Sequence, residues 1–144
     1  MKRKPRSDAG VTLIEMLVVV TIIGLFAFFV LPRFMGVADR SKRTKAGAQI
    51  AAYMQALHMY QLDNGAYPTT EQGLLALRVK PEGAPNWKKP YVEQDIENDP
   101  WGHPYVYRFP GEHDPDTPEI ICYGADGAPG GEDLNADIVS WKAK

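Results

Sequence analysis

The chain opens with a long apolar run that leads directly into a helical pattern of apolar and polar positions. From Val11 to Leu31, Glu15 is the only ionisable residue among 21 positions. A helix of that length is about 30 Å long, which matches the hydrocarbon thickness of a bilayer. Farther on, apolar residues recur at three- and four-residue steps, which is typical of one helical face: Ile50, Tyr53, Met54, Leu57 and Tyr60. Because Asn64–Gly65 is typical of a helix end, we predict one helix from about Thr12 to about Leu62.

The pattern changes after this helix. From Asp63 to Gly131 there are ten prolines and nine glycines, which predicts loops with short strands. Thr69–Gln72 has the form of a capping box and predicts a short helix through Leu74, Leu75 and Leu77. Alternating apolar positions predict three strands, at 103–109, 119–123 and 138–141. Asp99–Pro100 predicts a turn before the first of them. We therefore expect an α+β fold. Its long N-terminal helix, transmembrane in its first half, would pack on a small antiparallel sheet with a structured C-terminal loop.

The position of Glu15 calls for an explanation. An ionised acid inside a bilayer costs on the order of several kcal/mol unless it is paired, so we expect a positive partner at the same depth on another copy of the chain. The side chains of residues 1–10 carry a net charge of +3, which favours a cytoplasmic N-terminus and translocation of the C-terminal part. The alternative is a plain single-pass anchor with one tolerated acid near its edge.

Gly10 followed by Val-Thr-Leu-Ile-Glu-Met-Leu-Val resembles the class III signal of type IV pilins and pseudopilins. The resemblance implies that a prepilin peptidase cuts after Gly10 and that the new terminus, Val11, is N-methylated. In that family the first mature residue is usually Phe. The resemblance also implies that Glu15 neutralises the terminal amine of the neighbouring subunit during assembly. Gly24 and Pro32 resemble the stretch in which pilin helices loosen within the fibre.

Four internal segments narrow this resemblance to the major pseudopilins of type II secretion systems: 72–77, 83–87, 99–105 and 123–127. The resemblance implies a leader peptide, a hydrophobic assembly helix, an amphipathic continuation of that helix and a periplasmic globular domain. The expected boundaries of these four parts are 1–10, 11–32, 33–64 and 65–144.

The resemblance also implies a function. The chain would be a structural subunit of the pseudopilus, a single-pass protein of the inner membrane of a Gram-negative bacterium. It would polymerise through its N-terminal helix into a periplasmic fibre that drives export of folded proteins across the outer membrane. Its partners would be further copies, the prepilin peptidase, the inner-membrane assembly platform and minor pseudopilins. The alternatives are a type IV pilus subunit and a membrane-tethered periplasmic calcium-binding domain that never polymerises.

The C-terminal loop suggests ligand chemistry. From Asp126 to Asp137, five oxygen-bearing side chains fall within twelve residues, with four glycines or prolines between them. Calcium prefers such oxygen ligands, whereas no histidine or thiolate cluster nearby favours zinc or copper. The spacing alone leaves a solvated acidic loop as the alternative. The resemblance implies a structural Ca²⁺ bound by Asp126 and Asp133, with carbonyls near Tyr123 and Ala128. Asp137 is either a further ligand or a cap at the start of a strand.

Nothing in the sequence indicates an enzyme. The three histidines are scattered, no serine has the context of a catalytic triad, and no phosphate-binding glycine loop is present. Cys122 is the single cysteine, so no intrachain disulfide can form, and we expect it to be a small buried residue of a strand. Removing the leader changes the net charge from −2 to −5, which argues against nucleic-acid binding.

Overall fold

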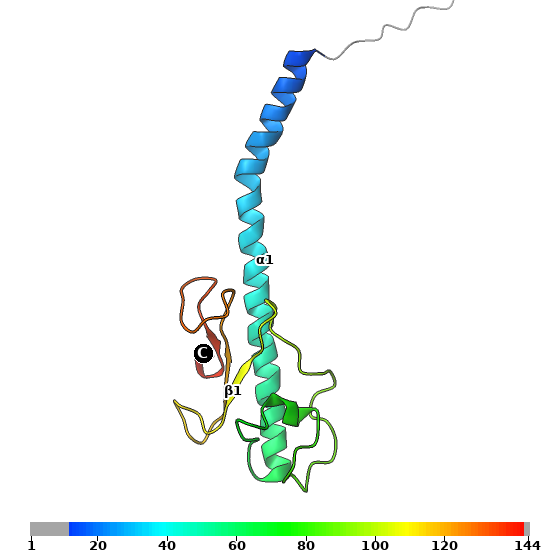
Figure 1. The fold of residues 1–144 in the computed structure, drawn as a ribbon, viewed down its shortest axis with the longest axis vertical. Coiled ribbons are helices and arrows are strands. Elements are labelled where there is room, and N and C mark those ends of the chain that lie inside the picture. The colour runs from blue at the N-terminus through cyan, green and yellow to red at the C-terminus, as the bar shows by residue number, and fades with distance from the viewer. Residues whose placement is uncertain (1–11, 143–144) are drawn as a thin grey trace, which may run out of the picture. The chain divides into compact units, whose positions relative to one another are not determined.

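The computed structural model describes residues 12–142, with the side chains of residues 12–29 and 38–141. Its main element is a single α-helix of 52 residues, α1, from Leu13 to Asn64 (Figure 1). The hydroxyl of Thr12 caps its start by accepting the Glu15 N–H at 3.3 Å. At its end Gly65 takes a left-handed conformation, with φ 83°, and donates its N–H to the Gln61 carbonyl at 2.7 Å. The predicted single helix and its glycine-marked end are confirmed.

The chain divides into two compact units, Met1–Ala38 and Asp39–Lys144. The second half of α1 therefore belongs to the same unit as all the strands. This agrees with the expectation that the long helix packs on the small sheet, and a domain this small needs the apolar face of the helix to complete its core.

The core of the second unit forms where α1 meets the short elements that follow it. Ile50, Tyr53, Leu57 and Tyr60 are buried on α1, as their spacing predicts, and Met54 is half-buried beside them. The remaining core side chains come from the rest of the unit: Leu74, Leu77, Tyr107, Ile120 and Cys122. The helix and the sheet thus depend on each other for burial of apolar surface.

The short helix after α1, η1, is a 3₁₀ helix at Leu74–Leu77. The predicted capping box is confirmed in the turn before it. The Thr69 N–H donates to Oε1 of Gln72 at 3.0 Å, and the Gln72 N–H donates to Oγ1 of Thr69 at 3.3 Å.

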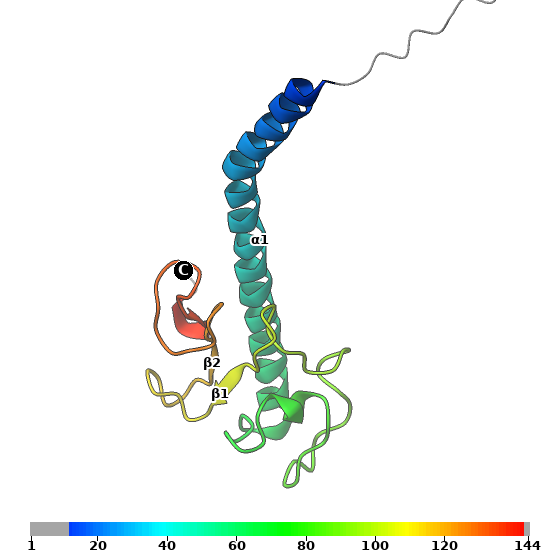
Figure 2. The ribbon, with the colours of Figure 1, turned by 45° about the horizontal axis from the view of Figure 1, so that its top comes forward.

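Three strands form an antiparallel sheet in the order β1-β2-β3. They are β1 (Val106–Arg108), β2 (Glu119–Cys122) and β3 (Ile138–Val139). Figure 2 shows β1 and β2 beside the second half of α1.

The sheet has the predicted strands, but all three are shorter than predicted, β2 by a single residue. The N–H of Phe109 leaves the ladder and donates to the Thr70 hydroxyl at 2.9 Å, so β1 ends at Arg108. A 3₁₀ helix, η2, replaces the end of the third predicted strand at Ser140–Lys142. There the Ser140 hydroxyl accepts the N–H of Ile120 at 3.1 Å, in place of a strand partner. Side chains have thus replaced backbone partners at both places.

Among the residues that the structure describes, no helix combines the length and the apolar character needed to cross a membrane. This differs from the prediction for residues 11–32. Val11 and the side chains of residues 30–37 lie outside the described part, so the described apolar stretch runs from Leu13 to Phe29. That stretch is shorter than the roughly 20 residues that a spanning helix needs.

Candidate functional site

The first half of α1 presents an unusual surface. Every large apolar side chain between Leu13 and Phe29 is exposed, from 43% at Val19 to 86% at Leu13. Soluble monomers rarely expose a continuous apolar surface of this extent, so the segment is suited to contact lipid or other apolar helices.

Glu15 lies in the first turn of α1, where the positive end of the helix dipole favours a carboxylate. The space around Gly24 is open, since a Cβ built there meets no atom within 4 Å. Pro32 lies within α1, and its side chain is outside the described part. The predicted processing residues Gly10 and Val11 also lie outside the described residues. The roles that the sequence suggests for these positions stay predictions.

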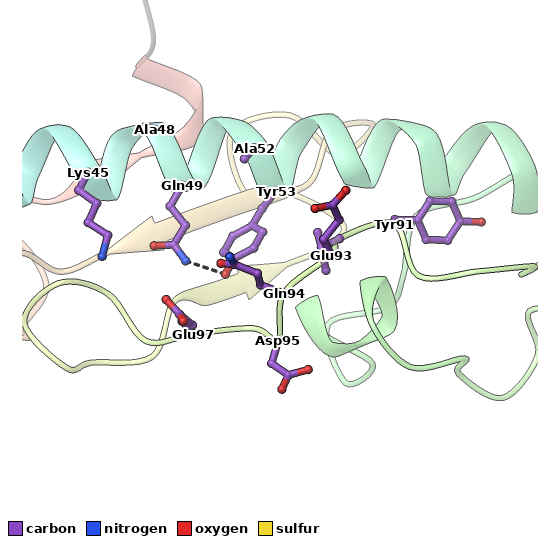
Figure 3. A pocket seen from close by; sticks show the side chains of 11 residues that line it. Lys45, Ala48, Gln49, Ala52, Tyr53, Tyr91, Glu93, Gln94, Asp95 and Glu97 are labelled. Atoms are coloured by element: carbon purple, nitrogen blue, oxygen red, sulfur yellow. Dashed lines mark hydrogen bonds between the residues drawn. The ribbon is translucent and has the colours of Figure 1, made fainter.

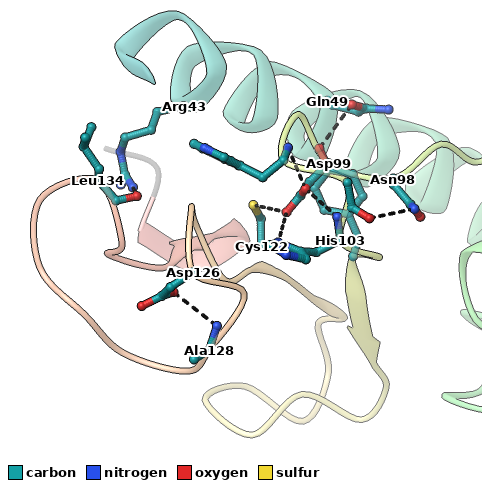
Figure 4. Close-up of polar contacts among 12 residues, drawn as sticks. Arg43, Gln49, Asn98, Asp99, His103, Cys122, Asp126, Ala128 and Leu134 are labelled. Carbon is teal, nitrogen blue, oxygen red and sulfur yellow. Dashed lines mark hydrogen bonds and ion pairs between the residues drawn. The ribbon is translucent and has the colours of Figure 1, made fainter. Parts of the chain in front are cut away.

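The second candidate site is the C-terminal loop. Oδ1 of Asp126 accepts the Ala128 N–H at 3.2 Å, and Oδ2 of Asp137 accepts the Gly130 N–H at 3.0 Å (Figure 4 shows the first contact). Asp133 takes a left-handed conformation, with φ 51°. The second oxygen of Asp137, Oδ1, is buried and has no hydrogen-bond partner. The loop therefore holds at least one buried carboxylate oxygen that lacks a partner.

The predicted calcium ligands differ in exposure. Asp126, Ala128 and Asp133 are exposed, whereas Tyr123 and Asp137 are half-buried. In the described part of the chain, no three His, Cys, Asp or Glu residues are grouped so that they could hold a metal ion. A cation in this loop would therefore need main-chain carbonyls beside one or two carboxylates, and the calcium site stays a prediction.

Arg43 connects α1 to this loop, and the sequence alone did not single it out. Its Nη1 donates to the carbonyls of Ala136, at 2.6 Å, and Leu134, at 3.3 Å. Leu134 in turn accepts the N–H of Ala125 at 3.2 Å, which closes the loop on itself. Figure 4 shows Arg43 reaching from the helix toward Leu134. One guanidinium thus fixes the position of the loop on the helix.

Asp99 is a second residue whose role the sequence only partly predicted. The expected turn at Asp99–Pro100 is confirmed, because Oδ1 of the buried Asp99 accepts the N–H groups of Trp101 and His103, both at 2.9 Å. Its Oδ2 also accepts the Cys122 thiol at 3.1 Å, which ties this turn to β2 (Figure 4). Burial raises the pKa of the Cys122 thiol to about 12. Cys122 is therefore a buried structural residue of a strand, as predicted, and its thiol stays protonated at neutral pH.

The turn at Asp99 also supports the C-terminal loop. Gly127 has φ 67°, and a Cβ at this position would lie 2.8 Å from the ring of His103. The loop therefore packs against the histidine ring so closely that only glycine fits there.

A long N-terminal helix with an exposed apolar first half, followed by a small antiparallel sheet on its second half, defines a pilin-like subunit. The family model described as "Type II secretion system (T2SS), protein G" matches residues 33–141, and the model of the prokaryotic N-terminal methylation motif matches residues 5–31. The chain belongs to the protein G family of type II secretion systems, the major pseudopilins. Members of this family are structural proteins and not enzymes.

Relatives from several bacteria support this assignment, and each is called type II secretion system core protein G. The protein of Pseudomonas aeruginosa is 47% identical over 139 residues, covering 94% of this chain and 96% of the relative. The protein of Vibrio cholerae is 43% identical and covers 96% and 95% of the two chains. The protein of Escherichia coli K12 is 42% identical and covers 96% and 94%.

A solved structure supports the fold. The crystal structure of the major pseudopilin from the type 2 secretion system of enterohaemorrhagic Escherichia coli superposes with a TM-score of 0.62 at 38% sequence identity. The match covers 80% of this chain and 99% of the other. The predicted pilin-like α+β architecture is thereby confirmed.

Proposed function

We propose that this major pseudopilin is cut after Gly10, methylated at Val11, and polymerised through the first half of α1 into a periplasmic fibre. The fibre drives export of folded proteins across the outer membrane. Before assembly the chain resides in the inner membrane of a Gram-negative bacterium, with its C-terminal unit in the periplasm. Its partners are further copies, the prepilin peptidase, the assembly platform and minor pseudopilins.

The observation that carries this proposal is the exposed apolar surface between Leu13 and Phe29. Because this surface is apolar along its whole length, it can lie in lipid before assembly and against the helices of other copies in the fibre, where close packing of side chains stabilises the contact. The methylation motif over residues 5–31 supports the same conclusion, because it covers the whole of this segment and the expected cleavage site.

Glu15 gives the assembly its register. Cleavage after Gly10 would leave a positive amine four positions before Glu15, and an amine from a neighbouring copy would offset the cost of burying the carboxylate. Thr12 already caps the helix through the Glu15 backbone N–H, so the carboxylate is not needed for that contact.

The proposal is tested by secretion in cells that carry Glu15→Lys. We expect this variant to accumulate normally and to form no fibres, because two positive charges would then meet in the core. The matched control is Glu82→Lys, which makes the same charge change at an exposed acid outside α1. Normal secretion with Glu15→Lys at wild-type levels would contradict the proposal. It would favour the alternative of a tethered domain that does not polymerise.

A second proposal concerns the C-terminal loop, where we infer one structural Ca²⁺. Asp126 and Asp133 would hold it, with the carbonyls of Tyr123 and Ala128, and Asp137 would be a further ligand or a cap. The residues present fit such an ion. Asp137 has a buried oxygen without a partner, and one oxygen of Asp126 remains after its hydrogen bond to Ala128. When bound, the ion would supply a cross-link for a loop rich in glycine.

Calcium removal tests the site. A ligand present at 100 times its Kd stabilises a protein by about 2.7 kcal/mol. For a unit of this size that corresponds to a thermal midpoint about 10 °C higher. We therefore expect a calcium chelator to lower the midpoint of the purified protein by about this amount, and added Ca²⁺ to restore it. A melting curve that excess chelator leaves unchanged would contradict the site.

Two variants distinguish a specific ligand role of Asp133 from a general effect of the negative charge of the loop. Asp133→Asn should abolish the calcium response, and asparagine tolerates the left-handed conformation of this position. Glu132→Gln removes the adjacent exposed acid, which is not an expected ligand, and should keep the response.

A further inference from the structure

A groove of about 590 Å³ runs between the second half of α1 and the segment 91–97. Ala48 and Ala52 line the groove on the helix side. Because both side chains are small and exposed, they leave the helix surface accessible. Figure 3 shows Lys45 and Gln49 projecting from α1 toward the facing segment. The groove is therefore an accessible strip of helix surface that the segment 91–97 borders on one side.

The bordering segment 91–97 is acidic. Glu93 and Glu97 line the groove and are exposed, and within the described residues neither forms an ion pair. Asp95 lies between them and is already paired with Arg78, at 2.9 Å from Oδ1 to Nε. Lys45 is the one cation among the described residues that line the groove. Two carboxylates are thus available to a positive partner.

A matching cation lies elsewhere on the same helix. Arg40 is exposed, and within the described part of the chain it forms no ion pair. It precedes Gln49 by nine positions, which is about two and a half helical turns and places the two residues on opposite sides of α1. Arg40 therefore faces away from the acidic groove of its own chain.

We propose that the groove receives the Arg40 face of α1 from a second copy of the chain, with the guanidinium between Glu93 and Glu97. Arginine suits this position because its planar group binds carboxylates through paired hydrogen bonds. The inference rests on the proposed fibre function and identifies one of its subunit contacts. Two different, complementary surfaces that face apart on one chain form a head-to-tail contact. Such contacts build open filaments or rings rather than two-fold dimers, and the first of these fits the proposed fibre.

Charge exchange tests the pairing in cells that assemble fibres from the full chain. Arg40→Glu alone, and Glu93→Lys with Glu97→Lys, should each lower the yield of fibres isolated from the periplasm about fivefold, since reversal turns attraction into repulsion at two exposed pairs. Combining all three substitutions restores the opposite charges and should bring the yield back to within about twofold of wild type. The matched controls are Lys88→Glu and Glu82→Lys, which reverse exposed charges outside the groove and should leave the yield unchanged.

Three outcomes would overturn the pairing. Wild-type yield from the Arg40→Glu variant would show that the residue makes no such contact. A triple variant no better than its worst parent would show that the charges do not meet. Loss of binding to phosphatidylglycerol vesicles by Arg40→Glu, without recovery of fibres in the triple variant, would assign Arg40 to lipid headgroups instead.

The assay also separates this inference from the function on which it rests. If the wild-type chain forms fibres and the charge variants form them in equal yield, the pairing is overturned and the fibre function stands. Absence of fibres from the wild-type chain would overturn the fibre function, and the pairing with it. All three substituted positions are exposed, and equal amounts of full-length protein in the cells verify that the variants fold.

Discussion

The contact between Arg43 and the C-terminal loop can be tested by its removal. Arg43→Met keeps the length and the apolar stem of the side chain but deletes both hydrogen bonds to the carbonyls of Leu134 and Ala136. A hydrogen bond to a charged group contributes about 1.5–3 kcal/mol. The contact at 2.6 Å should be near the top of this range, and the contact at 3.3 Å well below it.

Because Arg43 is half-buried, water would replace part of what is lost, and we expect the free energy of unfolding to fall by about 2–3 kcal/mol. For a unit of this size the thermal midpoint should fall by about 8–12 °C. Melting of the purified protein in detergent, followed by circular dichroism, measures the shift. Arg40→Met is the matched control. It removes an arginine side chain at an exposed position about one turn away on the same helix.

The reasoning would be refuted if Arg43→Met melted within about 2 °C of the Arg40→Met control, the range of a neutral surface change. A further variant sharpens the result. Arg43→Lys keeps the charge but not the planar fork, so it should recover less than half of the lost stability.

Two further predictions concern buried titratable groups. Cys122 should resist alkylation in the native protein at pH 8 and react only on unfolding, because burial raises the pKa of its thiol to about 12; rapid modification of the folded chain would contradict this. Burial works to raise the pKa of Glu119, but hydrogen bonds from the backbone and ring of His113 outweigh it and hold the pKa below the ordinary 4.5. The stability that ionised Glu119 contributes is therefore present above pH 4.5 and is lost as the pH falls further. Melting curves of Glu119→Gln should lack this acid-dependent loss. An identical pH dependence of the melting temperature in both proteins would contradict the role given to Glu119.

The elements that the sequence predicted well are those with local signals. The long helix follows from the spacing of Ile50, Leu57 and their neighbours, and its end from the conformational freedom of Gly65. The capping box at Thr69–Gln72 also depends on residues three positions apart, and the structure confirms both of its hydrogen bonds.

The features that the sequence did not predict depend on residues far apart in the chain. Thr70 ends β1 by accepting the N–H of Phe109, which lies 39 positions later. Arg43 contacts carbonyls 91 and 93 positions away, and any of the neighbouring cations would have served equally well as a candidate. Asp99 was recognised as a turn residue, but its bond to the Cys122 thiol requires the two segments to be brought together by the fold.

The central claim is that the chain becomes a fibre subunit after cleavage at Gly10 and assembles through the helix that follows. The most direct test is the mass of the chain recovered from fibres isolated from the periplasm. We predict a mass that lacks residues 1–10 and carries one added methyl group on Val11. Fibres built from the uncut chain, or cells that secrete normally while all copies remain uncut, would contradict the claim.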